Sequence, residues 1–463
     1  MNKPEKIVSA DLSEPLTYPV DAFISREYAE MEADKLWAKV WQQAGRVEEI
    51  PEVGDYITYN IANDSILIVR TGVDTIRAYH NVCPHRGRRL VGNCGLNGTG
   101  HSACGKAKRF TCNYHAWTFN LDGKATWILD KDDWQGVLTE DRTSLEDVQV
   151  GTWGGWIWIN MDPDCEPLAD FLAPLPELLD PFEFEKQRYR FRFYGVFDCN
   201  WKVALEAFLE PYHVAGTHPQ LLTYGDFYAW SQALGKHGND GFGSRDHADD
   251  HTAADTSVHR VAKGEDPRRS IARMQQEFWD TIGASTTETL VNAAQRLVDE
   301  LPEGTPAGEV HRHWIESAKR DDAARGVIWP DITDEEMARA GLALSIFPNM
   351  NIIPGPTFAL YYRVRPFGSD PDKCIYEAVA LDRFPEGAEP RTEWTFLEQD
   401  PAKWPLVIGQ DISNMVEVQR GYKSRGFRGN LPNPWQERKV TNLHRNLAKY
   451  MDGLGAPVPV KRT

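Results

Sequence analysis

The chain has 463 residues, a length that fits two to three domains with sizeable cores. Its composition, 41% hydrophobic and 26% charged, is ordinary for a soluble globular protein. The formal net charge of −17 argues against nucleic acid or an anionic membrane as the main partner, because both bind basic surfaces.

The N-terminal sequence MNKPEKIVSADLSEP has no apolar core of the kind found in signal peptides. No run reaches the roughly 18 apolar residues that a membrane helix needs. We therefore expect a cytoplasmic protein with no membrane partner. Four of the seven cysteines, Cys83, Cys94, Cys104 and Cys112, lie close together. In a reducing compartment such a cluster indicates metal binding before disulfides.

In chain order, residues 17–42 carry helical periodicity, with apolar positions from Ala29 to Val40 near one face. From about 45 to 162, short alternating runs such as DYITYNI, SILIVRTG and GGWIWINMD predict a small all-β domain. A proline- and acid-rich stretch, 162–185, reads as a connection. A strand is predicted over 188–199 and a helix from Trp201.

In the second half of the chain, polar segments alternate with apolar ones. The polar stretch HGNDGFGSRDHADDHTAADTS predicts an exposed loop, and residues 268–300 predict helices. Antiparallel strands are predicted over 342–384 and a final helical stretch from near Trp404. We expect three parts: a helical N-terminal segment (1–44) that packs on the largest domain, an all-β domain (45–162) and a large mixed domain (163–463).

The first group of chemically active residues is CPHRG (83–87) with CNYHAW (112–117). Each piece offers one thiol and one imidazole at short spacing, which suits metal ligation on tight turns. A zinc site is the alternative, although zinc ribbons more often use C-x-x-C pairs. The mixed set fits a Rieske [2Fe–2S] centre better, because there two cysteines hold one iron and two histidines hold the other.

The second group lies in NWKVALEAFLEPYHVAGTHP, residues 200–219. His213 and His218 are five residues apart, about 140° around a regular helix, so they face different directions. They can converge only if the helix breaks, and Pro211 and Gly216 are the residues that break helices.

Both motifs resemble those of the α (oxygenase) subunit of Rieske non-haem iron aromatic-ring-hydroxylating oxygenases. The resemblance implies that Cys83 and Cys112 bind one cluster iron, and His85 and His115 the other. It further implies a mononuclear Fe(II) held by His213, His218 and a distant carboxylate. The segment DISNM, which follows WPLVIGQ, supplies that carboxylate as Asp411. The alternative for Asp411 is a helix N-cap.

Two departures from the family pattern concern the catalytic motif. The family places an acidic residue three positions before the first histidine, where it accepts a hydrogen bond from a Rieske histidine of the neighbouring subunit. Most members use Asp, whereas this chain has Glu210, which is similar to the quaternary-ammonium branch that includes carnitine oxygenase. Ala207 stands where many members have Asn.

A third departure is a longer gap between the two halves of the Rieske motif. The extra segment GNCGLNGTGHSACG carries Cys94, His101 and Cys104. We expect a glycine-rich surface loop with two free thiols; a second metal site is the alternative.

The resemblance implies an α+β fold in which an all-β Rieske domain is inserted in a catalytic domain of antiparallel sheet and helices. It implies a head-to-tail homotrimer, or an α3β3 assembly with a β subunit. No G-x-G-x-x-G opens a helix after a strand, so electrons from NAD(P)H must come through a separate reductase, with or without a ferredoxin.

Three functions compete. The favoured one is ring dihydroxylation of an aromatic substrate in the catabolism of aromatic hydrocarbons. The second is a Rieske monooxygenase or O/N-demethylase, including one that acts on quaternary-ammonium substrates; Glu210 and the long 231–330 segment favour it. The third is an electron carrier without mononuclear iron, which would hold two irons per chain where an oxygenase holds three. The sequence leaves the exact substrate open.

Overall fold

The computed structural model describes residues 14–92, 102–224, 228–243 and 261–460. The chain forms two compact units. The large unit comprises Met1–Tyr28, Leu172–Arg365 and Pro371–Thr463, and the small unit comprises Ala29–Phe171 and Pro366–Asp370. The domain boundaries expected at 44/45 and 162/163 stay a prediction.

The small unit is built on a seven-stranded sheet in the order β2-β11-β10-β5-β4-β3-β6. Its strands are β2 (Gln42–Arg46), β3 (Asp55–Ile61), β4 (Asp64–Gly72), β5 (Thr75–His80), β6 (Cys104–Lys106), β10 (Asp147–Trp153) and β11 (Trp156–Asn160). A second, three-stranded sheet contains β7 (Phe110–Thr111), β8 (Thr118–Phe119) and β9 (Ala125–Trp127). The alternating runs in the sequence therefore do form strands.

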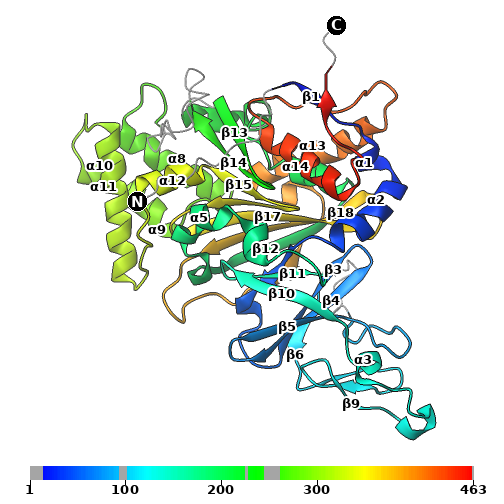
Figure 1. The fold of residues 1–463 in the computed structure, drawn as a ribbon. Coiled ribbons are helices and arrows are strands. Elements are labelled where there is room, and N and C mark those ends of the chain that lie inside the picture. Colours follow the sequence, from blue (N-terminus) through cyan, green and yellow to red (C-terminus); the bar gives the residue numbers. More distant parts are fainter. Residues whose placement is uncertain (1–13, 93–101, 225–227, 244–260, 461–463) are drawn as a thin grey trace, which may run out of the picture. The chain divides into compact units, whose positions relative to one another are not determined.

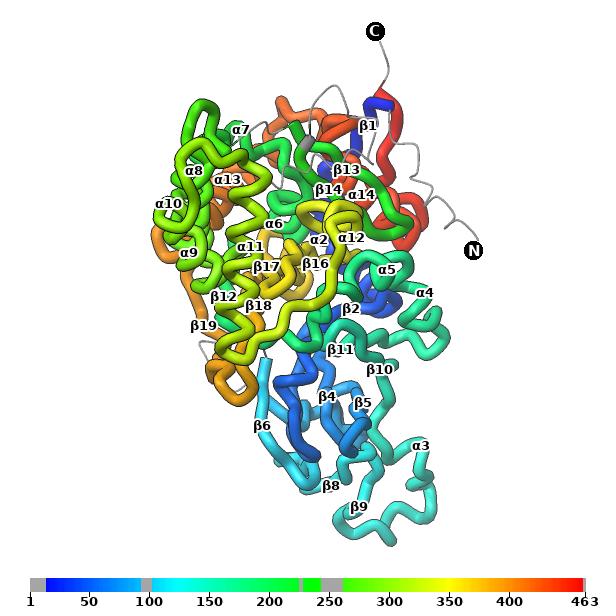
Figure 2. Tube along the Cα trace, turned by 90° about the vertical axis from the view of Figure 1, so that its left-hand side faces the viewer, coloured from blue at the N-terminus to red at the C-terminus, as the bar shows by residue number. Residues whose placement is uncertain are grey.

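The apolar core of this unit lies between its two sheets. Leu67 and Val69 of β4, Tyr79 of β5 and Phe119 of β8 are all at most 1% exposed and form one cluster. Cys83 and Cys112 belong to the same cluster. The β8–β9 hairpin and the short helix α3 (Glu140–Thr143) lie at the end of the unit opposite β2 and β11 (Figure 2).

The helical periodicity over 17–42 appears as short pieces rather than one helix. Strand β1 (Leu16–Thr17) pairs with β20 (Val458–Pro459), and the helical turns are α1 (Asp21–Ile24), α2 (Arg26–Glu32) and a π-helical turn, η1 (Ala33–Trp37). The proline-rich stretch 162–185 contains α4 (Leu168–Leu172) and α5 (Leu175–Leu179).

The large unit is built on an eight-stranded sheet in the order β13-β14-β15-β16-β17-β18-β12-β19. Its strands are β12 (Arg188–Phe197), β13 (Tyr228–Leu234), β14 (His237–Gly243), β15 (Ala343–Ile346), β16 (Met350–Pro354), β17 (Phe358–Phe367), β18 (Asp370–Asp382) and β19 (Trp394–Phe396). The β12–β19 pair is parallel, and the other described pairings are antiparallel. The strands predicted over 188–199 and 342–384 correspond to β12 and β15–β18.

The prediction of an exposed loop from His237 was wrong for its first seven residues. They form β14, in which Asn239 and Asp240 are buried. The polar side chains are tolerated because each has a partner: Asp240 pairs with the buried Lys439 at 2.5 Å, and Asn239 donates to the carbonyls of Arg339 and Ala340. Residues 244–260 of the predicted loop lie outside the described residues.

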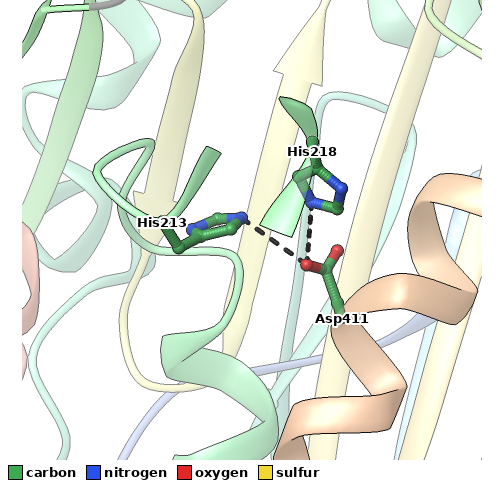
Figure 3. Close-up of side chains that lie close together, drawn as sticks. All are labelled: His213, His218 and Asp411. Atoms are coloured by element: carbon green, nitrogen blue, oxygen red, sulfur yellow. Dashed lines mark ion pairs between the residues drawn. The ribbon is translucent and has the colours of Figure 1, made fainter. Parts of the chain in front are cut away.

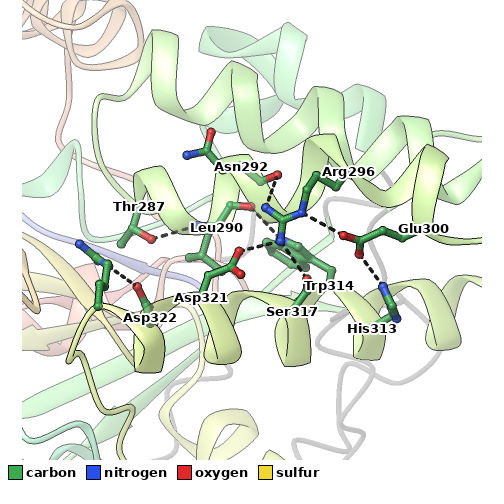
Figure 4. A network of polar contacts seen from close by, with 11 residues as sticks. Thr287, Leu290, Asn292, Arg296, Glu300, His313, Trp314, Ser317, Asp321 and Asp322 are labelled. Atoms are coloured by element: carbon green, nitrogen blue, oxygen red, sulfur yellow. Dashed lines mark hydrogen bonds and ion pairs between the residues drawn. The ribbon is translucent and has the colours of Figure 1, made fainter.

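A group of helices stands at one side of the large unit (Figure 1). It contains α8 (Pro267–Thr281), α9 (Glu288–Gln295), α10 (Leu297–Glu300), α11 (Ala307–Ala324) and α12 (Asp334–Ala340). Buried residues of α8, α9 and α11, among them Ile271, Ala293 and Ala318, form its core. Figure 4 shows the polar network of this group, in which Arg296 contacts Glu300 at 2.9 Å and Asp321 at 2.6 Å.

Four further helices lie near the sequence motifs: α6 (Trp201–Glu206), α7 (Val214–Thr217), α13 (Leu406–Tyr422) and α14 (Arg438–Tyr450). Asn200 caps α6, because its side chain accepts a hydrogen bond from the backbone N–H of Lys202. Helix α14 packs on β13 and β14, and α13 packs on α6 and α1. Among the described residues, no helix is long and apolar enough to cross a membrane.

Candidate metal centres

The two cysteine loops of the small unit have the same pattern of backbone hydrogen bonds. In the first, the N–H of Cys83 donates to the carbonyl of Arg88 at 2.8 Å, and the N–H of Gly87 donates back to the carbonyl of Cys83 at 3.0 Å. In the second, the N–H of Cys112 donates to the carbonyl of Trp117 at 2.8 Å, and the N–H of Ala116 donates to the carbonyl of Cys112 at 2.9 Å. Both loops therefore turn in the same way.

These loops bring the four predicted cluster ligands together. Cys83 and Cys112 are each 2% exposed, and the rings of His85 and His115 are 4.5 Å apart. Burial, with the neighbouring Cys112 thiol, raises the pKa of Cys83 to about 11. Burial also lowers the pKa of His85, with a contribution from the adjacent His115. Both shifts disfavour charge, so a bound cation would be needed to hold the thiolates.

An unsatisfied buried atom tests whether these residues fit a [2Fe–2S] cluster. Nδ1 of His115 is buried and has no hydrogen-bond partner among the described residues. A buried imidazole nitrogen normally has a partner, and a metal is one that it commonly takes. The ring of Trp117 stacks on His85 at 4.9 Å and Trp134 meets it edge-on at 5.4 Å, so His85 is held in place. The residues fit the cluster.

The inserted segment of the Rieske motif is only partly described. Cys104 begins β6, is exposed, and lies opposite Ile57 of β3. Cys94 and His101 lie outside the described residues, so the prediction of a surface loop is not tested for them.

In the large unit, the chain breaks its helix between α6 and α7. Helix α6 ends at Glu206, and α7 is a single turn with His213 and His218 at its two ends. Pro211 lies in the break, as expected, whereas Gly216 lies inside α7. Because the two histidines flank one turn, their rings come within 5.3 Å of each other.

Asp411 of α13 completes this site (Figure 3). His213 Nε2 lies 3.5 Å and His218 Nε2 2.9 Å from Asp411 Oδ1. One ligand atom from each residue falls within 4.8 Å of the others, a spacing that suits a single metal ion. Asp411 is the sixth residue of α13, so it does not cap this helix.

Each histidine is oriented by an acceptor behind its ring. His213 Nδ1–H donates to Glu210 Oε1 at 2.9 Å, and the backbone N–H of His213 donates to Glu210 Oε2 at 2.9 Å. His218 Nδ1 lies 2.8 Å from Gln410 Oε1. These bonds leave both Nε2 atoms facing Asp411, where a metal would take their lone pairs. The residues therefore fit a mononuclear iron.

The charge balance of the site favours a cation. Burial opposes the charged form of His213, but the carboxylates of Glu210 and Asp411 outweigh it and raise the pKa of His213 to about 9. Asp411 is 4% exposed and His218 is 2% exposed. A divalent ion would offset both carboxylates in this buried place.

Beside the metal site lies a cavity of about 390 Å³. Glu206, Glu210, Glu437 and Asp411 line it, with His213 and the tyrosines Tyr18 and Tyr422. None of the described residues that line it is a lysine or an arginine. Burial raises the pKa of Glu437 to about 7, with contributions from Glu210 and Glu206. We call this space the acidic cavity.

Three site residues were missed by the sequence analysis. Gln410 lies behind His218, and Gln220 Nε2 donates to Gln410 Oε1 at 2.8 Å. His444 of α14 pairs with Glu206 at 2.5 Å behind the acidic cavity. Gln410 precedes Asp411 and Gln220 follows His218 by two residues, so these positions were the local signals, whereas the contact of His444 with Glu206 joins distant segments.

Two family models match the chain. The Rieske [2Fe–2S] domain matches residues 40–136, and the catalytic domain of the ring-hydroxylating alpha subunit matches residues 183–453. The second match covers more than half of the chain. The chain belongs to the ring-hydroxylating alpha-subunit family. The predicted α+β class, with an all-β Rieske domain inserted in a catalytic domain, is confirmed, and so are the cofactors of this oxygenase family: a Rieske [2Fe–2S] cluster and a mononuclear non-haem iron.

The curated relatives of this alpha subunit include components of monooxygenases and of dioxygenases. The oxygenase subunit of glycine betaine monooxygenase from Pseudomonas aeruginosa (strain UCBPP-PA14) is 29% identical over 224 residues, which cover 48% of this chain and 50% of the relative. The chain thus spans about half the length of the curated relative it matches.

Two solved structures share the fold along nearly the whole chain. The quaternary ammonium Rieske monooxygenase CntA, solved with L-carnitine, has a TM-score of 0.62 and 20% identity, covering 97% of this chain and 99% of that one. Naphthalene 1,2-dioxygenase, solved with indole bound in the active site, has a TM-score of 0.61 and 17% identity, covering 98% and 96%. A monooxygenase and a dioxygenase thus share this fold, so the fold alone does not decide which reaction a member catalyses.

Proposed function

We propose that this alpha subunit is the terminal oxygenase of a system that uses O₂ and electrons from a separate reductase to oxidise a quaternary-ammonium substrate. The observation that carries the proposal is the set His213, His218 and Asp411, with Glu210 behind His213. Glu210, where most ring-hydroxylating members have Asp, and the likeness to a glycine betaine monooxygenase subunit favour this substrate class over an arene.

The reaction that follows is hydroxylation of a C–H bond next to the positive nitrogen. One oxygen atom enters the C–H bond, and the other leaves as water with two electrons and two protons. The resulting carbinol, R₃N⁺–CH(OH)R′, releases a proton and breaks its C–N bond to give a tertiary amine and an aldehyde. The positively charged nitrogen takes the electron pair of the C–N bond and leaves as a neutral amine, so this cleavage is the expected fate of the carbinol.

The chain's residues have separate roles in this scheme. We assign Cys83, His85, Cys112 and His115 to the cluster, and His213, His218 and Asp411 to the iron. When bound, the cluster supplies single electrons and the iron supplies O₂ activation. Glu210 holds the Nδ1 proton of His213, so that Nε2 stays free for the metal, and the aromatic rings of Trp117 and Trp134 hold His85.

The proposed path for electrons runs between two copies of the chain. The cluster loops present exposed cations at Arg86, Arg88 and Arg89, with Tyr114 53% exposed. The acidic cavity presents the opposite charge and contains Glu210, whose carboxylate oxygens can accept a further hydrogen bond. A cluster loop of one subunit docked in the acidic cavity of the next would put Glu210 between the two metal centres, in the head-to-tail homotrimer that we expected.

The remaining partners follow from the same scheme. The chain has no recognisable nicotinamide or flavin motif, so a reductase, alone or with a ferredoxin, must reduce the cluster. A β subunit and a cytoplasmic location stay predictions. Ring dihydroxylation of an aromatic hydrocarbon is the second candidate function, favoured by the family description and by the shared fold of naphthalene 1,2-dioxygenase.

Iron counting with electron paramagnetic resonance tests the proposed centres. We expect three irons per chain and a Rieske signal after reduction. His115→Ala should leave one iron and no Rieske signal, whereas His213→Ala should leave two irons and an unchanged signal. Two irons in the unaltered protein would contradict the proposal and favour a simple electron carrier.

A further inference from the structure

Behind His218, two glutamines form a hydrogen-bonded pair that no role above uses. Gln410 Oε1 lies 2.8 Å from His218 Nδ1 and also accepts a hydrogen bond of 2.8 Å from Gln220 Nε2. Gln410 directly precedes Asp411 on α13, and Gln220 lies two residues after His218. Two segments that are distant in sequence are thus tied together at the back of one imidazole.

The pair decides which nitrogen of His218 carries the proton. An amide oxygen only accepts, so His218 must place its hydrogen on Nδ1 when Gln410 Oε1 faces it. The donation from Gln220 Nε2 favours that orientation, because a flipped Gln410 would set its own NH₂ group against the NH₂ group of Gln220. His218 Nε2 is then left with a lone pair that faces Asp411 Oδ1 at 2.9 Å.

The two histidines differ in the charge of the group behind them. His213 is backed by the carboxylate of Glu210, and His218 by a neutral amide. Glu210 and Asp411 already supply two negative charges, which match a divalent ion. A third carboxylate at position 410 would place an excess negative charge in the metal-free site, which costs stability rather than affinity for a cation, and a neutral acceptor avoids this cost.

We propose that Gln410, braced by Gln220, is a positioning residue that fixes the tautomer and ring orientation of His218 and thereby sets the affinity of the mononuclear site for its metal. Helix α13 then contributes both a ligand, Asp411, and the group that aims a second ligand. This inference rests on the proposed ligand set, and it concerns how tightly and in what geometry that set binds.

The test uses cobalt(II), titrated into the full-length protein after removal of the mononuclear iron, with cluster absorbance recorded as a check on the small unit. Cobalt(II) has visible absorption bands whose position and intensity report its coordination geometry. Gln410→Leu should weaken binding roughly 10- to 100-fold and change the spectrum, as is usual when the hydrogen-bond partner of a metal-bound histidine is lost. Gln410→Glu keeps the acceptor and should bind at least as tightly as the unaltered protein.

Two further variants make the test specific. Gln220→Leu leaves the His218–Gln410 bond in place, so it should cause a smaller loss than Gln410→Leu; it also serves if Gln410→Leu does not fold. Gln276→Leu removes a half-buried glutamine on α8 that bonds only to Asp280 in its described contacts, and it should bind cobalt(II) as the unaltered protein does.

Unaltered affinity and spectrum in Gln410→Leu would overturn the inference. So would a Gln410→Glu protein as weak as Gln410→Leu, because packing rather than hydrogen bonding would then be responsible. If the unaltered protein itself bound no cobalt(II), the proposed ligand set would fail, and that result is distinct from a failure of Gln410 alone.

Discussion

Ala116 occupies in the second cysteine loop the place that Gly87 occupies in the first. Each donates its N–H to the carbonyl of the cysteine four residues before it, and each has a positive φ, 58° for Ala116 and 73° for Gly87. A positive φ costs a residue with a side chain roughly 1–2 kcal/mol, and glycine almost nothing. The two loops therefore reach the same shape at different local cost.

This relationship predicts that stability responds differently to substitution at the two positions. Gly87→Ala should lower stability by about 1 kcal/mol, entirely through the backbone, because a Cβ atom at Gly87 meets nothing within 4 Å. Ala116→Gly should be neutral to within about 0.5 kcal/mol, because the relief of strain is offset by the greater freedom of glycine in the unfolded chain. The measurement is the thermal transition at which cluster absorbance is lost. Equal losses in both variants would contradict the account.

Glu210→Gln should keep both metal centres and lose most turnover. A glutamine oxygen can still accept the Nδ1 hydrogen of His213. However, the negative charge of Glu210, which lies between the two metal centres on the proposed electron path, is lost. Iron content, the Rieske signal and the rate with a natural reductase would be measured together. Full activity in this variant would show that electrons reach the iron by another route.

The proposed docking between copies predicts complementation. His115→Ala lacks the cluster and His213→Ala lacks the iron, so each alone should be inactive. Subunits of the two variants, unfolded or dissociated and then reassembled together, should regain part of the activity, because a cluster in one copy can serve the iron in the next. Assembly of each variant with itself is the control. Mixed assemblies as inactive as their parents would contradict electron transfer between copies.

Glu437 in the acidic cavity predicts a dependence of stability on pH. Its raised pKa, about 7, means that the folded state holds the proton more tightly than the unfolded state, so this residue contributes less stability as the pH rises from about 4.5 through 7. Glu437→Gln should melt roughly 1–2 °C higher than the unaltered protein at pH 8, for a gain of about 1 kcal/mol, with little advantage at pH 5. The exposed Glu389, changed to Gln, is the control. An equal effect at both pH values would contradict the assignment.

The proposed metal ligands could be predicted because their signals are local. Cys83 with His85, and Cys112 with His115, lie on single tight turns, and His213 and His218 flank the single turn of α7. Asp411 is the exception: nothing in its own surroundings indicates a ligand, and only the family pattern connected it to the distant histidine motif. In the structure, Asp411 Oδ1 lies 2.9 Å from His218 Nε2.

The remaining features depend on contacts that a linear pattern does not contain. Strand β14 reads as a loop because it carries glycines and polar residues, yet Asp240 is buried against Lys439 from the far end of the chain. In the sequence, Gln410 looks like any other polar residue of a helix. Only the fold brings it against His218. Buried polar residues mislead composition-based prediction when their partners are distant in sequence.

The most direct test of the central claim is product analysis after turnover with a reductase under ¹⁸O₂, using glycine betaine, carnitine and naphthalene as parallel substrates. The account predicts a tertiary amine and a carbonyl product from a quaternary-ammonium substrate, with one O₂ consumed per amine released and none of either product from His213→Ala. A dihydrodiol of naphthalene that carries two ¹⁸O atoms, with both quaternary amines left unchanged, would contradict it and establish the aromatic dioxygenase instead.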